Sequence, residues 1–149
     1  MVGYRFFIAG IIQGSKRDSV IHSQEYRDLI KEILNKVFPD SEIYCPVENH
    51  PDSISYDDTK AREVFMKHLD IVRKAHCLVA YLPEASMGTS IEMWEAYNQK
   101  TVTVTITPLA RNWVIRILSD KICPDIESFR TFAESGEMKR FLQKRFSIM

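Results

Sequence analysis

The chain has 149 residues, the length of one domain, and it can bury a core without a metal or disulfide staple. It is 45% hydrophobic and 27% charged, which excludes a disordered chain, a coiled coil and a collagen-like repeat. Its 20 basic and 20 acidic residues balance, so no basic excess points to a nucleic-acid partner.

The first half of the chain alternates between apolar and helical patterns. Residues 4–12 are nearly all apolar without a helical period, which is typical of a strand covered on both faces. A helical pattern then runs over 20–37, a short strand is expected at 43–45, and a polar loop covers 47–57. Three residues are candidate caps for that first helix: Ser15, Asp18 and Ser19.

The second half continues the alternation, beginning with a helix that starts at Asp58 or Thr59. A buried strand at 77–82 is followed by a small-residue loop. The remaining expected elements are a helix at 90–98, a strand at 101–107, a helix at 113–118, an edge strand at 121–123 and one last helix at 126–146. Strands that alternate with helices predict a flavodoxin-like, Rossmann-like α/β/α domain over 1–149, with a mainly parallel five-stranded sheet.

Ligands of such folds bind outside the carboxyl ends of the strands. Here those ends are predicted at 9–15, 46–57 and 83–90. The longest apolar run, 6–12, is too short to cross a bilayer and no cleavage site follows it, so we expect a cytoplasmic protein without a membrane span. The three cysteines are widely spaced in apolar surroundings, which predicts buried, reduced thiols rather than a metal site: Cys45, Cys77 and Cys123.

The loop after the strand at 77–82 is the most informative stretch. Ser86, Gly88 and Thr89 offer hydroxyls and backbone N–H groups at the start of a helix, which is typical of an anion site. Glu92 follows about one turn into that helix, where the helix dipole is expected to keep its carboxylate ionised. The alternative is a purely structural cap, with Glu92 as the partner of a capping box.

Two further segments are candidates. Gly10, in the first loop, would let a ligand approach the backbone, although a simple turn at the strand end is the alternative, and the loop has no dinucleotide or P-loop motif. His68 shares a helix face with Val64 and Val72 and is expected to face the sheet, as a core histidine or as an acid, base or donor. The polar residues of the neighbouring loop are interpreted as solubilising and capping: His50, Asp52, Asp57 and Asp58.

Three stretches together resemble the nucleoside 2-deoxyribosyltransferase superfamily, which includes 2'-deoxynucleoside 5'-monophosphate N-glycosidases. They are FFIAGIIQGS at 6–15, AHCLVAYLPE at 75–84 and SMGTSIEMWEA at 86–96. The resemblance covers nearly the whole chain. It implies a flavodoxin-like fold, no metal or organic cofactor, and an active site shared across a homo-oligomer interface.

The resemblance also implies roles for individual residues. Glu92 matches the nucleophile that attacks the anomeric carbon of the sugar. Ser86 matches a serine that holds the 5'-phosphate, and Asn112 resembles an asparagine lent by a neighbouring subunit. Substrate-binding positions are then expected at Phe7, Gly10, Gln13, Ser86, Gly88, Thr89 and Asn112.

Three positions depart from the family pattern. Phe7 stands where many members have a tyrosine, and Gln13 where the monophosphate hydrolases often carry arginine. His68 falls where many members have the aspartate that donates a proton to the leaving base; Asp70 fits that place only with a two-residue shift. His68 could take over the acid role, since its unperturbed pKa of about 6.5 suits it.

The expected function is hydrolysis of the N-glycosidic bond of a nucleoside or deoxynucleoside 5'-monophosphate. Glu92 would be the nucleophile and His68 would assist the leaving base. The alternatives are base exchange by a deoxyribosyltransferase and a nucleotide-binding module with little catalysis. The expected partners are a small nucleotide or nucleoside and a second copy of the chain, for which Trp113 and Ile115 are candidate interface residues that a buried core would equally explain.

Overall fold

The computed structural model describes residues 3–147 and contains one sheet of five parallel strands. The strands follow the spatial order β2-β1-β3-β4-β5. Their bounds are Arg5–Gly10 (β1), Glu42–Tyr44 (β2), Cys77–Tyr81 (β3), Val102–Ile106 (β4) and Lys121–Cys123 (β5). The expected five-stranded parallel sheet is therefore confirmed, and every strand pair in it is parallel.

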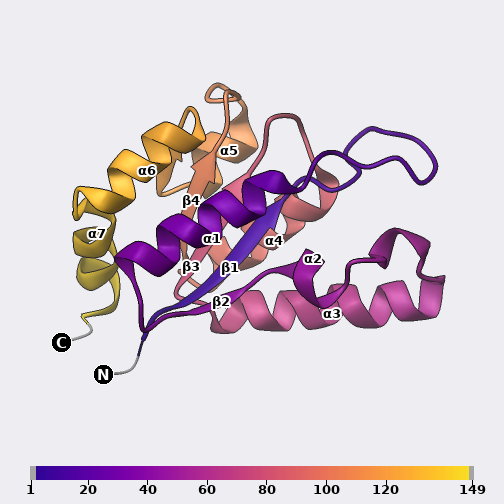
Figure 1. Cartoon of the computed structure of the whole chain (residues 1–149), viewed down its shortest axis with the longest axis horizontal. Coiled ribbons are helices and arrows are strands. Elements are labelled where there is room, and N and C mark those ends of the chain that lie inside the picture. Colours follow the sequence, from indigo (N-terminus) through magenta and orange to yellow (C-terminus); the bar gives the residue numbers. More distant parts are fainter. Residues whose placement is uncertain (1–2, 148–149) are drawn as a thin grey trace.

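Helices cover both faces of this sheet and make three layers (Figure 1). On one face lie α1 (Glu25–Val37), α6 (Ile126–Glu134) and α7 (Glu137–Phe146), and on the other α3 (Asp58–Lys74), α4 (Met87–Asn98) and α5 (Trp113–Leu118). A one-turn helix, α2 (Pro46–Asn49), follows β2. Two cores result, one on each side of the sheet, because alternate residues of a strand point to opposite faces.

Strand β1 shows this alternation directly. Phe6 and Ile8 pack under α1, whereas Phe7 and Ala9 pack under the helices of the opposite face. All four side chains are buried, as expected for a central parallel strand covered on both sides.

The first helix begins later than its apolar pattern predicts. Residues 11–24 form an extended loop beyond the end of β1, drawn in indigo on the right of Figure 1, and α1 starts only at Glu25. Gly14 and Asp18 have φ angles of 58° and 57°, a left-handed conformation that an α-helix does not contain. Val20 and Ile21 are consequently exposed, and none of the three candidate caps begins the helix.

Three other boundaries differ from the prediction. The expected loop at 47–57 contains most of α2 and a 3-10 turn at Ser53–Ser55. Helix α4 begins at Met87, about one turn before the expected start. The single helix expected at 126–146 is two helices, because Gly136 adopts a φ of 85° between α6 and α7.

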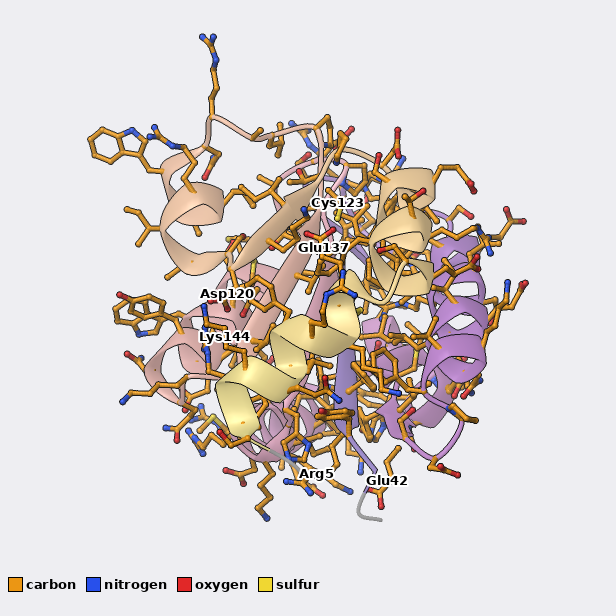
Figure 2. The ribbon with its side chains drawn as sticks, turned by 90° about the vertical axis from the view of Figure 1, so that its left-hand side faces the viewer. Arg5, Glu42, Asp120, Cys123, Glu137 and Lys144 are labelled. Carbon is orange, nitrogen blue, oxygen red and sulfur yellow. The ribbon has the colours of Figure 1, made fainter. Side chains whose placement is uncertain are left out.

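Figure 2 views the molecule from the side of α7. Glu137 at the start of α7 lies near the β5 edge, where Lys121 pairs with it at 3.5 Å, and Arg145 bonds Asp120 at 2.6 Å. These partly exposed ion pairs lie near the β5 edge of the sheet, opposite β2, while Met138 and Leu142 are the buried residues that pack α7 into the core. The three cysteines are buried and unpaired, as predicted. Within residues 3–147, no helix is long and apolar enough to span a membrane.

Candidate active site

A cavity of about 310 Å³ opens at the carboxyl ends of β1 and β3. It is bounded by the loop after β1, by the α2 segment, by one face of α3 and by the first turns of α4. Seven of the residues predicted for substrate binding or catalysis line it: Gly10, Gln13, His68, Ser86, Gly88, Thr89 and Glu92. The fold thus brings together segments that lie as much as 80 positions apart in the chain, at the edge where ligands of such sheets bind.

Glu92 projects into this cavity from the second turn of α4 and is partly buried. Among the residues that the structure describes, its carboxyl makes no ion pair with a basic side chain. Burial raises its pKa from 4.5 to about 8, although the charge of Arg27 lowers it in part. The expectation that the helix dipole keeps Glu92 ionised is therefore wrong, because desolvation outweighs the dipole in the second turn of the helix.

The N-terminus of α4 forms the wall beside Glu92. Ser86 is its N-cap: its hydroxyl accepts a bond from the Thr89 N–H at 3.4 Å and donates to the Thr89 hydroxyl at 3.1 Å. The first helical bond runs from the Ser90 N–H to the Ser86 carbonyl, so the N–H groups of Met87 and Gly88 have no acceptor within the helix. The structural cap is present, but Glu92 has no part in it, since the capping-box position is Thr89.

His68 lies in the cavity wall on α3 and faces the sheet, as its helix position predicts. Its Nε2 lies 3.2 Å from the Tyr44 hydroxyl, and its ring meets those of Phe7, Tyr44 and His50 edge-on. Burial lowers its pKa to about 4, with further contributions from His50, Lys67 and Arg27. The prediction that a pKa near 6.5 suits His68 as an acid is wrong, because at neutral pH the ring is uncharged.

Aromatic side chains extend this wall away from the sheet. The Tyr56 hydroxyl lies 2.9 Å from Nδ1 of His50, and both side chains line the cavity from the segment between β2 and α3. Phe65 of α3 also lines the cavity. The sequence analysis interpreted His50 as a solubilising loop residue, and its place in the cavity corrects that interpretation.

Arg27 is a lining residue that the sequence analysis missed. It lies in the first turn of α1, is 4% exposed, and reaches the end of β1. The signal was present, because Arg27 shares the buried helix stripe with Ile30 and Leu34, at spacings of three and four residues. A charged residue in an apolar stripe is a candidate for a functional role.

Three predicted positions have other roles in the structure. Phe7 is fully buried beneath Tyr44 and does not line the cavity. Gly10 lines it, but a Cβ at Gly10 would lie 2.4 Å from the Tyr26 hydroxyl, so packing against Tyr26 requires the glycine. Asn112 is outside the cavity and caps α5: its side-chain oxygen accepts bonds from the N–H groups of Val114 and Ile115, at 2.9 and 3.4 Å.

The outer faces of α4 and α5 carry a large exposed apolar surface. Met87 is 83% and Trp113 is 76% exposed, and five neighbours on the two helices are at least 43% exposed. This surface, called the α4–α5 face below, consists of Met87, Ile91, Trp94, Tyr97, Trp113, Val114 and Ile117. Ile115, the other candidate interface residue, is buried and belongs to the core. An apolar surface of this extent is typical of a protein interface.

Solved structures share this fold. The 2-deoxyribosyltransferase of Bacillus psychrosaccharolyticus has a TM-score of 0.61 and 13% identity, over 85% of this chain and 90% of that one. A conserved protein from Enterococcus faecalis V583 has a TM-score of 0.64 and 16% identity, over 89% and 98%. The CMP N-glycosidase of Clostridium botulinum has a TM-score of 0.55 and 14% identity, over 88% and 98%. No protein-family profile and no curated protein sequence matches the chain. The chain therefore has the fold of the nucleoside 2-deoxyribosyltransferase-like proteins that its motifs resemble.

Proposed function

We propose that this protein cleaves the N-glycosidic bond of a nucleoside 5'-monophosphate, with Glu92 as the nucleophile. The observation that carries the proposal is the position of Glu92, a carboxyl without an ionic partner beside a helix N-terminus in the cavity. A nucleophilic carboxylate and an anion site in one cavity suit a substrate that has both a sugar and a phosphate. The fold shared with a deoxyribosyltransferase and a CMP N-glycosidase supports the same chemistry.

The reaction proceeds in two steps. A Glu92 carboxylate oxygen attacks the anomeric carbon, the carbon–nitrogen bond breaks, and the base leaves with the bonding electrons and takes up a proton from solvent, which the later hydrolysis by water returns. Water then hydrolyses the sugar ester of Glu92, which yields the sugar phosphate and regenerates the carboxylate. The neutral His68 ring donates a hydrogen bond to the leaving base instead of acting as a charged acid.

The first turn of α4 holds the phosphate. The N–H groups of Met87 and Gly88 point toward the helix N-terminus, where an anion is stabilised by the helix dipole. The Ser86 hydroxyl lies beside them and would turn its proton from Thr89 to a phosphate oxygen. Gly88 leaves room for this approach, because no atom beyond its chain neighbours and the backbone of its own helix lies within 4 Å of a Cβ placed there.

Base release tests the proposal. Ribo- and deoxynucleoside 5'-monophosphates and the matching nucleosides are incubated with the protein, and the free base is measured by chromatography. Glu92→Ala should abolish release that depends on the phosphate. Glu95→Ala is the matched control, because Glu95 lies on the same helix but pairs with Arg73 at 2.6 Å outside the cavity. Release of base that persists in Glu92→Ala would refute the role of Glu92 as the nucleophile.

Adding a second free base to the same assay separates hydrolysis from transfer. Accumulation of the exchanged nucleotide instead of the sugar phosphate would identify a transferase. The raised pKa of Glu92 favours a second candidate, a nucleotide-binding module, since a protonated carboxyl is a poor nucleophile. That candidate requires a nucleotide to raise the melting temperature without any release of base.

The proposal includes a second copy of the chain. The α4–α5 face would form the contact, and Asn112 at its margin would reach the neighbouring cavity, since Asn112 does not line the cavity of its own chain. Trp113→Glu should reduce the mass measured by light scattering, whereas Met66→Glu, at an exposed apolar residue of α3, should not. Mixing Glu92→Ala with Asn112→Ala should restore activity if each site takes residues from two chains.

A further inference from the structure

Arg27 is the one charged residue that is buried within residues 3–147. Its guanidinium is held by the end of β1: Nη1 donates to the Ile8 carbonyl and Nη2 to the Gly10 carbonyl, each at 3.1 Å. Nε donates to the side-chain oxygen of Gln24 at 2.8 Å, and Nη1 lies 3.8 Å from the Cys45 sulfur. These four contacts fix the orientation of the guanidinium at the base of the cavity.

None of these partners carries a full negative charge. In the described part of the chain, Arg27 forms no ion pair with a carboxylate. Every other buried polar residue there is a threonine, which carries no charge. An isolated buried cation is costly, and carbonyl dipoles offset only part of the cost. The one carboxyl among the residues that line the cavity with Arg27 is Glu92.

We propose that Arg27 is a positioning residue for the reaction proposed above: its buried guanidinium supplies the positive charge that favours the ionised, nucleophilic form of Glu92. The inference rests on the proposed function for its catalytic meaning. The electrostatic relation between the two side chains is a property of the protein itself and can be measured without a substrate.

Other titratable groups lie around the cavity that holds Glu92, on α1, on the α2–α3 segment and on α3. Helix α1 contributes Tyr26 in addition to Arg27, the α2–α3 segment contributes His50 and Tyr56, and α3 contributes His68. Burial raises the pKa of Tyr26 and lowers that of His68, so both are neutral at pH 7. Arg27 carries the only permanent positive charge in this set.

The physical consequence is a balance of two effects on Glu92. Burial favours the neutral acid, and Arg27 favours the carboxylate, so the pKa of Glu92 is about 8 instead of higher. Removing the charge of Arg27 should therefore raise the pKa of Glu92 further. At a pH below both pKa values, an increase of about one pKa unit lowers the fraction of nucleophile about tenfold.

The experiment measures the titration of the Glu92 carboxyl by carbon-13 NMR, with the signal assigned by its loss in Glu92→Gln. The variants are Arg27→Gln, Arg27→Met and Arg27→Lys. We expect the midpoint to rise by about one pH unit or more in the neutral variants, and by less in Arg27→Lys, which retains a charge on a shorter stem. Arg73→Gln is the control, since it removes an exposed arginine of α3 that pairs with Glu95, which lies on the same helix as Glu92.

The acid-side midpoint of the pH profile of kcat/KM for base release should rise in the same order of variants as the pKa of Glu92. The reason is that kcat/KM reports the ionisations of the free enzyme. A Glu92 midpoint that is unchanged in every folded Arg27 variant would overturn the inference, even if those variants lose activity. Arg27→Gln retains an N–H donor for the β1 carbonyls without the charge, so it keeps the test decisive if Arg27→Met does not fold, and Arg27→Lys shows whether the shift follows the charge. Failure of the proposed function has a separate signature, which is release of base that does not depend on Glu92.

Discussion

Replacing Glu92 by glutamine should stabilise the fold, and the gain should depend on pH. The native carboxyl has a pKa of about 8, whereas in the unfolded chain it has its ordinary value of 4.5. Between these values the native state holds a proton that the unfolded state has lost. The wild type therefore loses stability as the pH rises from about 4.5 to 8, and Glu92→Gln does not share this loss.

The size of the effect follows from the difference between the two pKa values. At about 1.4 kcal/mol for each pKa unit, raising the pKa from 4.5 to about 8 corresponds to about 5 kcal/mol. The carboxyl is only partly buried, so water in the cavity screens part of this penalty. We expect Glu92→Gln to exceed the wild type by about 2–4 kcal/mol in free energy of unfolding above pH 8, and by less than about 1 kcal/mol near pH 5.

Urea unfolding followed by circular dichroism, from about pH 5 to pH 9, measures this difference. Glu63→Gln is the matched control, because Glu63 is exposed on α3 and its pairing with Lys60, at 3.8 Å, contributes little. Its stability relative to the wild type should vary by less than about 0.5 kcal/mol over the same range. A difference for Glu92→Gln that stays constant with pH, or that falls as the pH rises, would refute the reasoning about Glu92.

Three further predictions follow from local geometry. Gly10→Ala should destabilise the protein by about 1–3 kcal/mol in thermal unfolding, because the new Cβ would overlap the Tyr26 ring. Gly88→Ala should be neutral or slightly stabilising, since a Cβ there meets open space. Equal stability of the two variants would contradict this packing. The His68 ring should titrate near pH 4 in proton NMR, and a midpoint near 6.5 would show that it is not desolvated. The three buried thiols should resist alkylation in the native protein and react only after unfolding, as measured by mass spectrometry, so rapid labelling of any of them would be inconsistent with their burial.

The sequence by itself determined the architecture. Runs such as 4–12 and 77–82 are apolar at nearly every position, and a strand covered on both faces buries such a run. Alternation with amphipathic helices then requires parallel strands and crossover connections. The segment from Ser86 to Glu92 was found in the same way, because small residues that begin a helix at a strand end are typical of an anion site whatever the rest of the fold.

The ends of the helices were less predictable from the sequence than the architecture, for a local reason. The apolar residues Val20 and Ile21 fit the helical period of α1, yet left-handed residues at Gly14 and Asp18 keep the chain in a loop. Periodicity counts apolar positions without indicating which of them the fold buries. Gly136 ends α6 by the same left-handed conformation within a continuous helical pattern.

Tertiary structure alone decided the electrostatics of the site. The dipole of the helix that carries Glu92 predicted an ionised carboxylate. The pKa of Glu92 depends instead on burial by segments distant in sequence and on Arg27 from another helix. His68 likewise has neighbours from β1, β2 and the α2 segment, which remove it from water and lower its pKa. Residue identity and spacing fix what a side chain can do in isolation, whereas desolvation and charge pairing arise only when distant segments pack together.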